Sequence, residues 1–394
     1  MKKKYLLCLI LLLLSSCTVN SCSSSFSSSS KGQNEITDFS KLYKFVGDSK
    51  LIFSEIMTDN NVANRAIEIA NIGENDIDLK DYAISIFRNG VNKASEIISL
   101  SGMLAKEQTY VIAYSEASDD IKAKADLVTD LYMNDGTFGL LLTYQKDKYV
   151  DILGTPGYSY DYAKGVTMVR KKEYFKAESL FSSYSYIKYP VGSISTLGNL
   201  NAISESDLLK GPRLTDGDEN SSFALSETTG GGGIVKVSVT GYIDGDTTRF
   251  NYGTSLSSFG ISGSLSTRYY GINTPEIAHG SGEVSDSYGD EAKAFTDNML
   301  RNAKNILIQS IRNSSLHETY GRMLGYVWIS NVSNPSLQDY ELLNFRIVQN
   351  GFSNVGFLSR SNNINDMIYN DISYAEYLYD AENYARINKL NLHS

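Results

Sequence analysis

The sequence predicts a multidomain protein whose first folded region is all-β and whose second is α+β. Its 394 residues exceed the roughly 150 residues of a typical single domain. The content of 42% hydrophobic and 21% charged residues is ordinary for folded chains and excludes a wholly disordered or polytopic membrane protein. Short strand-like runs between Gly, Asn and Asp fill the first region, and helical spacing of apolar residues appears in the second.

The charge balance and the cysteines exclude some functional classes. The chain has 36 Lys plus Arg against 45 Asp plus Glu, a formal net charge of −9, so any site for a polyanion must be local. The three cysteines, Cys8, Cys17 and Cys22, all lie near the N-terminus. A disulfide framework or a cysteine zinc site further along the chain is therefore excluded.

Residues 1–16 are predicted to be a lipoprotein signal peptide. Lys2 to Lys4 form a basic start, and Tyr5–Leu14 is an apolar run too short to span a bilayer. The Leu-Ser-Ser-Cys sequence ending at Cys17 resembles the bacterial lipobox. This resemblance implies lipidation of Cys17 and a location on the extracytoplasmic face of the cell membrane. The alternative is a plain signal peptide with incidental cysteines.

Residues 17–48 are predicted to be a serine-rich tether, because they contain too few apolar groups to pack a core. Residues 49–203 then change to short strands at close spacing, which favours a β-sandwich. The expected strands are Leu51–Ile56, Arg65–Ala70, Tyr82–Phe87, Thr109–Ala113, Gly139–Tyr144 and Tyr149–Leu153.

The order of these pieces resembles the lamin tail domain. The resemblance lies in Ile52–Ile56, Ala66–Asn71, Ile77–Leu79 and Val150–Gly154. It implies an immunoglobulin-like sandwich without shared catalytic residues, so the domain is expected to bind an unknown ligand or act as a spacer. Several of its polar residues are expected to cap turns or face solvent rather than bind a metal: Glu68, Asn71, Asp78 and Asp151.

Residues 204–233 are predicted to be a flexible linker, because they are polar and end in four glycines. A new strand is expected at Ile234–Val239. Two segments with helical spacing, Asp290–Lys304 and Tyr374–Ile387, are expected to pack as helices on the second domain. Trp328 lies in a strand-like run and is expected in the core.

An ordered series of motifs fills residues 234–394. An Asp-Gly-Asp turn at 244–246 is weak evidence alone, but the motifs that follow it are Arg268–Glu276, Tyr288–Ala292, Tyr320–Arg322, Leu343–Asn344 and Asn350–Phe352. The series is similar to the staphylococcal nuclease (thermonuclease) family. That resemblance implies an OB-fold barrel with packed helices and an endonuclease that hydrolyses phosphodiester bonds in DNA or RNA.

Phosphodiester hydrolysis needs cations beside the phosphate and an activated water. Asp246, Asn273 and Thr274 offer carboxylate, amide and backbone oxygens, which suit Ca²⁺ better than zinc. Asp244 is a further acidic group that we expect behind these ligands. Asn273 stands where the family usually has an acidic ligand, so weaker metal binding is expected.

The resemblance also implies roles for other residues. Glu276 matches the proposed general base of the family, and Arg268 and Arg322 match the arginines that bind phosphate. Guanidinium groups suit that role because they bind two phosphoryl oxygens at fixed geometry. The alternative for both arginines is an ion pair with Glu276 or Glu318, or a solvated charge at a strand edge.

Tyr320 and Phe357 match tyrosines that flank the nucleotide, where aromatic faces can stack on bases. Phe357 lacks the hydroxyl of the family residue. The alternative to a nuclease is a catalytically degenerate lipoprotein that binds nucleic acid or acts in adhesion.

Overall fold

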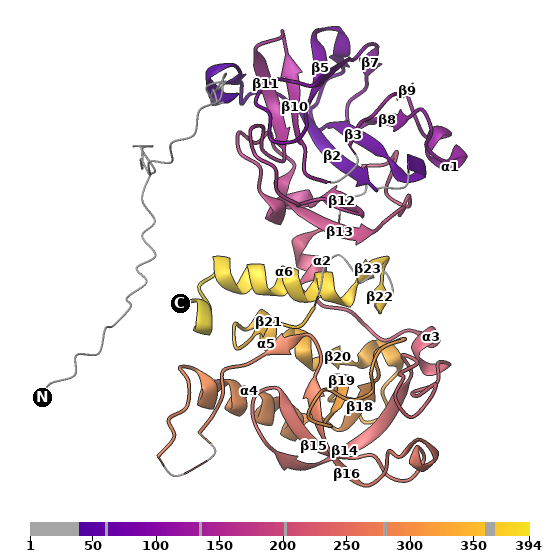
Figure 1. The fold of residues 1–394 in the computed structure, drawn as a ribbon, viewed down its shortest axis with the longest axis vertical. Coiled ribbons are helices and arrows are strands. Elements are labelled where there is room, and N and C mark those ends of the chain that lie inside the picture. The colour runs from indigo at the N-terminus through magenta and orange to yellow at the C-terminus, as the bar shows by residue number, and fades with distance from the viewer. Residues whose placement is uncertain are drawn as a thin grey trace, which may run out of the picture. The chain divides into compact units, whose positions relative to one another are not determined.

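A computed structural model describes residues 39–59, 62–133, 136–200, 203–278, 280, 282–358 and 367–394 (Figure 1). The predicted signal peptide, Cys17 and the tether up to residue 38 lie outside the described residues. Among the helices in the described ranges, none combines the length and apolar character needed to cross a membrane.

Two sheets form the first folded region. The five-stranded sheet has the order β1-β11-β10-β5-β6, and the six-stranded sheet has the order β13-β12-β2-β3-β8-β9. The first contains β1 (Lys44–Phe45), β5 (Tyr82–Phe87), β6 (Glu96–Ser99), β10 (Gly139–Tyr144) and β11 (Lys148–Leu153). The second contains β2 (Leu51–Thr58), β3 (Ala66–Asn71), β8 (Thr109–Tyr114), β9 (Leu127–Thr129), β12 (Val166–Arg170) and β13 (Tyr186–Pro190).

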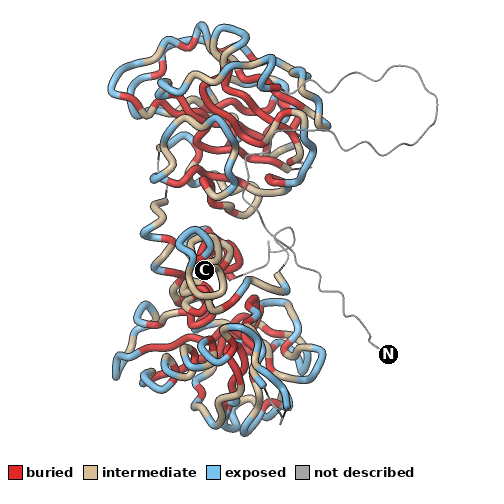
Figure 2. Tube along the Cα trace, turned by 90° about the vertical axis from the view of Figure 1, so that its left-hand side faces the viewer, coloured by how far each residue is buried: buried red, intermediate tan, exposed pale blue. Residues whose placement is uncertain are grey.

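One hydrophobic core lies between these sheets, with contributions from both, such as Ile67 of β3 and Leu140 of β10. Figure 2 shows the buried residues in the interior of this region and the exposed ones mainly at its periphery. All six strands expected from the short runs between turn residues are present with small shifts at their ends. The region also contains a short ladder of β4 (Ile77–Asp78) with β7 (Met103–Leu104), and a single helical turn, α1 (Asp119–Lys122).

The ordered part of this region begins earlier than expected. Residues 39–48 were predicted to belong to the tether, but β1 pairs in parallel with β11. Phe39 is buried in a small cluster with Phe87 and Tyr149, and Phe45 packs against it. These aromatic side chains supply the apolar area that the serine-rich residues 21–30 lack.

Two acidic residues also depart from the expectation of solvent exposure. Asp78 does cap a turn, because its carboxylate accepts a hydrogen bond from the backbone N–H of Lys80. Glu68 and Asp151, in contrast, are buried, with at most 1% of each residue exposed. The periodicity of the strands does not reveal them because polar partners, rather than solvent, satisfy most of their oxygens.

The second region is built around a closed barrel. Its strands are β14 (Ile234–Tyr242), β15 (Thr247–Asn251), β16 (Ser264–Tyr269), β18 (Asn305–Gln309), β19 (Met323–Ser330) and β20 (Glu341–Leu342). The sheet order is β16-β15-β14-β18-β19-β20, and β16 also pairs in parallel with β19. This extra pairing joins the ends of a five-stranded ring, which fits an OB-like barrel.

Helices cover part of the barrel: α4 (Gly289–Asn302), α5 (Leu343–Gln349) and α6 (Tyr374–Ile387). Helix α5 packs against β19 and against both other helices. Both predicted helices are therefore confirmed, and Trp328 is fully buried as expected. Two short ladders complete the region, β17 (Ile272–Asn273) with β21 (Asn354–Val355), and β22 (Ile368–Tyr369) with β23 (Ile372–Ser373).

The segment 204–233 differs from the flexible linker that its composition predicts. It contains two helical turns, α2 (Glu205–Leu208) and α3 (Asp216–Glu219). Four of its side chains are buried in the same hydrophobic cluster as the barrel residues: Leu208, Leu214, Phe223 and Ala224. The ring of Phe223 lies 6.3 Å from that of Tyr252, centroid to centroid. A few well-spaced apolar residues therefore attach a mostly polar segment to a neighbouring core.

Candidate active site

An acidic turn between β14 and β15 forms the first part of the site. The carboxylate of Asp244 accepts a hydrogen bond from the backbone N–H of Asp246 at 3.1 Å, and both side chains are buried. A Cβ at Gly245 would lie 2.8 Å from Oγ1 of Thr274, so only glycine permits this close approach. Thr296 of α4 donates a hydrogen bond to the carbonyl of Gly245 at 2.6 Å. The helix thereby holds the turn in position.

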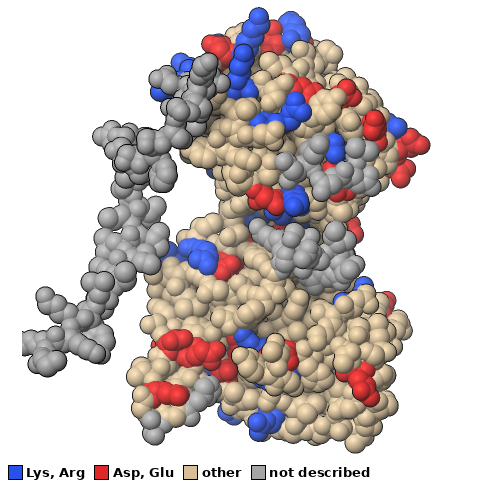
Figure 3. All heavy atoms as spheres, in the orientation of Figure 1, with Lys and Arg blue, Asp and Glu red and all other residues tan. Residues whose placement is uncertain are grey.

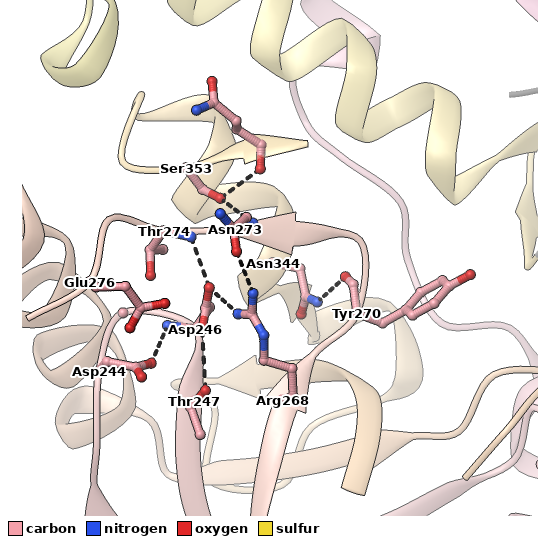
Figure 4. A network of polar contacts seen from close by, with 12 residues as sticks. Asp244, Asp246, Thr247, Arg268, Tyr270, Asn273, Thr274, Glu276, Asn344 and Ser353 are labelled. Atoms are coloured by element: carbon pink, nitrogen blue, oxygen red, sulfur yellow. Dashed lines mark hydrogen bonds and ion pairs between the residues drawn. The ribbon is translucent and has the colours of Figure 1, made fainter. Parts of the chain in front are cut away.

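Asp246 connects three segments of the barrel (Figure 4). Its carboxylate accepts hydrogen bonds from the backbone N–H of Thr274 at 2.8 Å and from the hydroxyl of Thr247 at 3.2 Å. It also forms an ion pair with Arg268. The antiparallel register that sets Thr247 opposite Arg268 brings this pair together.

Arg268 bridges the acidic turn and the segment after β17. Its Nη2 donates a hydrogen bond to Oδ1 of Asn273 at 2.7 Å, while the ion pair engages Asp246. The backbone N–H of Asn273 donates in turn to Oγ of Ser353 at 2.9 Å. Burial, together with repulsion from Arg322, lowers the pKa of Arg268, and the nearby Asp244 and Glu276 oppose that shift. The guanidinium is thus a buried cation surrounded by oxygen atoms.

Arg322 approaches the same place from the loop before β19. Its Nε donates to Oε1 of Glu318 at 2.9 Å, and its Nη1 lies 3.4 Å from the hydroxyl of Thr247. Burial alone would raise the pKa of Glu318, but the hydrogen bond from Arg322 brings it below its ordinary value. The ion pair anticipated as the alternative for Arg322 is therefore present.

Glu276 lies beside the acidic turn but at the surface. Its side chain lies close to those of Asp244 and Asp246 in Figure 4, and the residue is exposed. Its backbone is fixed by two hydrogen bonds with Asp286, one in each direction, of 3.2 and 2.9 Å. An exposed carboxylate with a fixed backbone is accessible to water and to a substrate.

Burial raises the pKa of Asp244, and the neighbouring Arg268 and Arg322 oppose that effect. Three carboxylates, those of Asp244, Asp246 and Glu276, thus face two guanidinium groups, of which that of Arg322 is already paired with Glu318. The excess of negative charge and the oxygen-only donors fit a hard divalent cation. Asp244, Asp246, Asn273 and the carbonyl of Thr274 could hold it. Within the described ranges, no group of three or more His, Cys, Asp or Glu side chains is arranged to hold a metal.

The two aromatic residues expected to contact nucleotide are both exposed. Tyr320 is 85% and Phe357 is 82% exposed. The ring centroid of Tyr320 lies 5.9 Å from the guanidinium carbon of Arg322. Phe357 follows β21, which pairs with the strand that carries Asn273. Both rings are therefore free to contact a ligand next to the polar cluster.

Sequence reasoning gave no role to Thr247, Thr296 or Ser353, which orient the predicted residues. Thr247 directly follows the acidic turn, and Ser353 directly follows the Asn350–Phe352 motif. Their positions next to motifs are the only signal in the sequence, because a hydroxyl residue near a turn is common in any protein.

Comparison with protein families adds one finding. Residues 266–394 match the family model described as staphylococcal nuclease homologue. The match includes Arg268, Asn273, Thr274, Glu276 and Arg322, and it begins after the acidic turn. This match supports the prediction of a nuclease-type domain that hydrolyses or binds nucleic acid, and it covers the part of the chain that contributes most of the polar cluster. The C-terminal part of this chain is therefore similar to the staphylococcal nuclease homologues.

Proposed function

We propose that the protein is an endonuclease that hydrolyses phosphodiester bonds in DNA or RNA. The observation that carries this proposal is that Arg268 lies with the carboxylates of Asp244, Asp246 and Glu276 (Figure 4). Arg322 adds a second guanidinium, whose Nη1 lies 3.4 Å from the hydroxyl of Thr247. Arg268 and Arg322 come together because β16 pairs in parallel with β19. The family match of residues 266–394 supports the same reaction class.

The proposal assigns a role to each group. Negative charge grows on the phosphoryl oxygens during attack on phosphorus, and Arg268 and Arg322 stabilise it. Glu276 acts as the general base that accepts a proton from the attacking water. Tyr320 and Phe357 stack on bases without reading sequence.

Substrate binding depends on these few cations rather than on a broad basic surface. Residues 234–394 contain 12 Lys plus Arg against 16 Asp plus Glu. On the face shown in Figure 3, acidic and basic side chains are interspersed. General attraction of the phosphate backbone is therefore weak, and correctly oriented guanidinium groups supply the binding energy.

The proposed cofactor is Ca²⁺, with Asp246, Asn273 and the carbonyl of Thr274 as its ligands and Asp244 close behind them. A bound Ca²⁺ would polarise the phosphoryl oxygen and favour ionisation of water. Asn273 contributes an oxygen without formal charge, so the affinity for Ca²⁺ is expected to be lower than with an aspartate at this position.

A second candidate function is binding of nucleic acid without cleavage, including a role in adhesion. The observation that favours it is the engagement of Arg268, which contacts both Asp246 and Asn273. The guanidinium thus occupies two of the oxygens that a metal would use. In that function the arginines retain the strand, but no bond is broken.

Incubation of the mature protein with end-labelled single-stranded DNA or RNA, in Ca²⁺ or in chelator, separates the two functions. A hydrolase shortens the strand in Ca²⁺ only, and Asp246→Asn removes that activity. The asparagine keeps an acceptor for the N–H of Thr274 while removing the charge. A circular strand tests the mode of cleavage, because only an endonuclease opens it. Intact strands in every condition would leave binding as the function.

The first folded region is proposed to be a lamin tail-like module with an immunoglobulin-like sandwich, which binds a separate ligand or holds the nuclease away from its anchor. The two sheets around one core are compatible with this assignment. Together with a lipid on Cys17, the arrangement corresponds to a nuclease at the extracytoplasmic face of the cell membrane.

The anchor is tested by Cys17→Ser. Acyl chains supply the membrane affinity, so the variant is expected to leave the membrane fraction or be mislocalised, whereas Cys22→Ser, the matched control, is not. The measurement is fractionation combined with incorporation of labelled fatty acid. An unlabelled wild-type protein that remains in the membrane fraction would contradict lipidation.

A further inference from the structure

Two buried glutamates of the first folded region face each other across neighbouring strands. Glu55 of β2 and Glu68 of β3 are partners in the antiparallel register, and each is 1% exposed. Directly opposed side chains lie on the same face of a sheet at close distance. The pair is therefore a concentration of acidic groups inside the protein.

The oxygens of the two carboxyl groups are unequally satisfied. Glu68 accepts hydrogen bonds from the hydroxyl of Ser54 at 2.6 Å and from the backbone N–H of Gly198 at 2.7 Å. Oε1 of Glu55 and the hydroxyl oxygen of Thr196 are both buried without a hydrogen bond of normal geometry among the described residues. The two atoms are near each other, because the hydroxyl of Thr196 lowers the pKa of Glu55. A buried carboxyl oxygen without a partner is costly, so these atoms indicate a missing ligand.

No cation of the described residues forms an ion pair with either glutamate. Lys124 lowers the pKa of both glutamates, but its ammonium donates to the carbonyl of Leu197 at 2.7 Å. Arg170 lines the cavity beside the glutamates, but its guanidinium forms an ion pair with Asp151. Burial, followed by repulsion from Glu68, raises the pKa of Glu55 to about 8. Burial raises the pKa of Glu68 to about 7, although Ser54 and Gly198 oppose that shift.

The same region gives another buried acid a counter-charge. Asp151 forms an ion pair with Arg170, with Oδ2 3.0 Å from Nη2. It also accepts hydrogen bonds from the backbone N–H groups of Phe53 and Glu178 at 2.8 and 2.9 Å. The lack of a counter-charge at Glu55 and Glu68 is therefore a local property of this pair.

A small cavity of about 10 Å³ adjoins the glutamates. Its polar lining residues are Ser54, Glu55, Glu68, Asn199 and Arg170, and its apolar ones are Val169, Phe175 and Leu200. This volume corresponds to about one water molecule or one monatomic ion. Phe175, Asn199 and Leu200 also line a larger open pocket of about 530 Å³, so the cavity beside the glutamates adjoins a solvent-accessible pocket.

We propose that Glu55 and Glu68 bind one divalent cation of the hard type, such as Ca²⁺ or Mg²⁺, in this cavity. The two carboxylates supply the charge, and the hydroxyls of Ser54 and Thr196 supply further oxygen ligands. This site lies in the first folded region and does not depend on the proposed nuclease activity. Its ion links β2 and β3 to the segment that contains Thr196.

Calorimetric titration of the metal-stripped whole chain tests the site, with CaCl₂ and MgCl₂ in separate experiments. All proteins carry Asp246→Asn, which removes the charged member of the three proposed Ca²⁺ ligands in the barrel. The parent is expected to bind one ion. The Glu55→Gln and Glu68→Gln variants should bind it at least about 100-fold more weakly, because even mutation of residues that only hydrogen-bond to metal ligands lowers metal affinity 10–100-fold. Glu74→Gln, which neutralises an exposed glutamate after β3, is the control and should bind like the parent.

Thermal unfolding provides a second measurement, which shows whether a substitution changes the stability of the fold rather than ion binding alone. The ion should raise the midpoint of the parent and of Glu74→Gln but not of Glu55→Gln. Without metal, Glu55→Gln should be at least as stable as the parent, because it removes one of two repelling charges. The proposal is wrong if, with both ions, the parent and Glu55→Gln show the same binding stoichiometry and the same shift of the unfolding midpoint. In that case the two glutamates share only a proton.

Discussion

The two folded regions both bury a pair of acidic residues, but they compensate the charge differently. In the barrel, Asp244 and Asp246 share a turn, and Arg268 forms an ion pair within their site. In the two-sheet region, Glu55 and Glu68 lie on different strands and have no ion pair among the described residues. Buried charges without partners are strongly unfavourable. The barrel thus contains its own cation, whereas the glutamate pair depends on a proton or an external ion.

The difference also concerns access. Around the barrel pair, Glu276, Tyr320 and Phe357 are exposed, so a large ligand can reach it. Around the glutamate pair, the adjoining cavity has room for about one ion. The same kind of residue pair is therefore compatible with a reaction site in one region and with a structural ion in the other.

The largest expected effect tests where the barrel region begins. Phe223→Ala should destabilise it by about 3–5 kcal/mol, because truncation of a buried phenylalanine loses apolar contacts and leaves a cavity. Trp328 is the single tryptophan of the sequence and lies in β19, so its fluorescence reports unfolding of the barrel. Leu225→Ala, at a residue that is 58% exposed, is the control from the same segment. If Phe223→Ala and Leu225→Ala have equal unfolding midpoints, residues 204–233 are a linker and not part of the barrel region.

The next effect tests whether the barrel cations stabilise charge in the transition state. Arg268→Ala and Arg322→Ala should each lower the single-turnover rate roughly 100-fold or more, about 2.7 kcal/mol, and weaken substrate binding much less. Lysine at either position should restore little, because it lacks the two-pronged geometry. Arg249→Ala, which removes an exposed cation of β15, is the control.

These rates are measured together with binding of a single-stranded oligonucleotide at fixed salt. Equal losses of rate and affinity would reject the transition-state role and support a binding module. Full activity of Arg322→Ala would reject the assignment of that residue.

The smallest expected effect concerns the charge of the proposed calcium ligands. Asn273→Asp adds a carboxylate beside Asp246, so the Ca²⁺ concentration that gives half-maximal cleavage should fall by up to about tenfold, since ligand charge tunes calcium affinity. Asn354→Asp, at the position opposite Asn273 in the β17–β21 ladder, adds the same charge as a control. An unchanged concentration for Asn273→Asp would exclude this residue as a ligand.

The sequence predicted the strands and helices well where hydrophobic periodicity reflects burial. The fully buried β2 and the amphipathic α4 both follow from their patterns. The cluster of Asp246, Arg268, Asn273 and Arg322 was predicted from motif order, and the structure brings these residues together. What each of them does in a reaction stays a prediction.

Two kinds of feature were beyond the sequence. Phe223 and Phe39 attach polar segments to cores, and single apolar residues in such segments have no periodicity to detect. The pairing of Glu55 with Glu68 depends on strand register, which an isolated strand pattern does not contain. Both features arise from contacts between residues that are distant along the chain.

The closure of the barrel determines when the site exists during folding. Asp246 directly precedes β15, and Arg268 lies on β16. The two strands are an antiparallel pair that is local in the sequence. Arg322 joins them only when β19 pairs in parallel with β16, after a long loop has closed. Contacts between distant residues form slowly. A chain that has formed only its local hairpins therefore has Arg268 in place at the site, but not yet Arg322. Catalytic competence is thus expected to arise at the end of folding, together with the last long-range strand pairing.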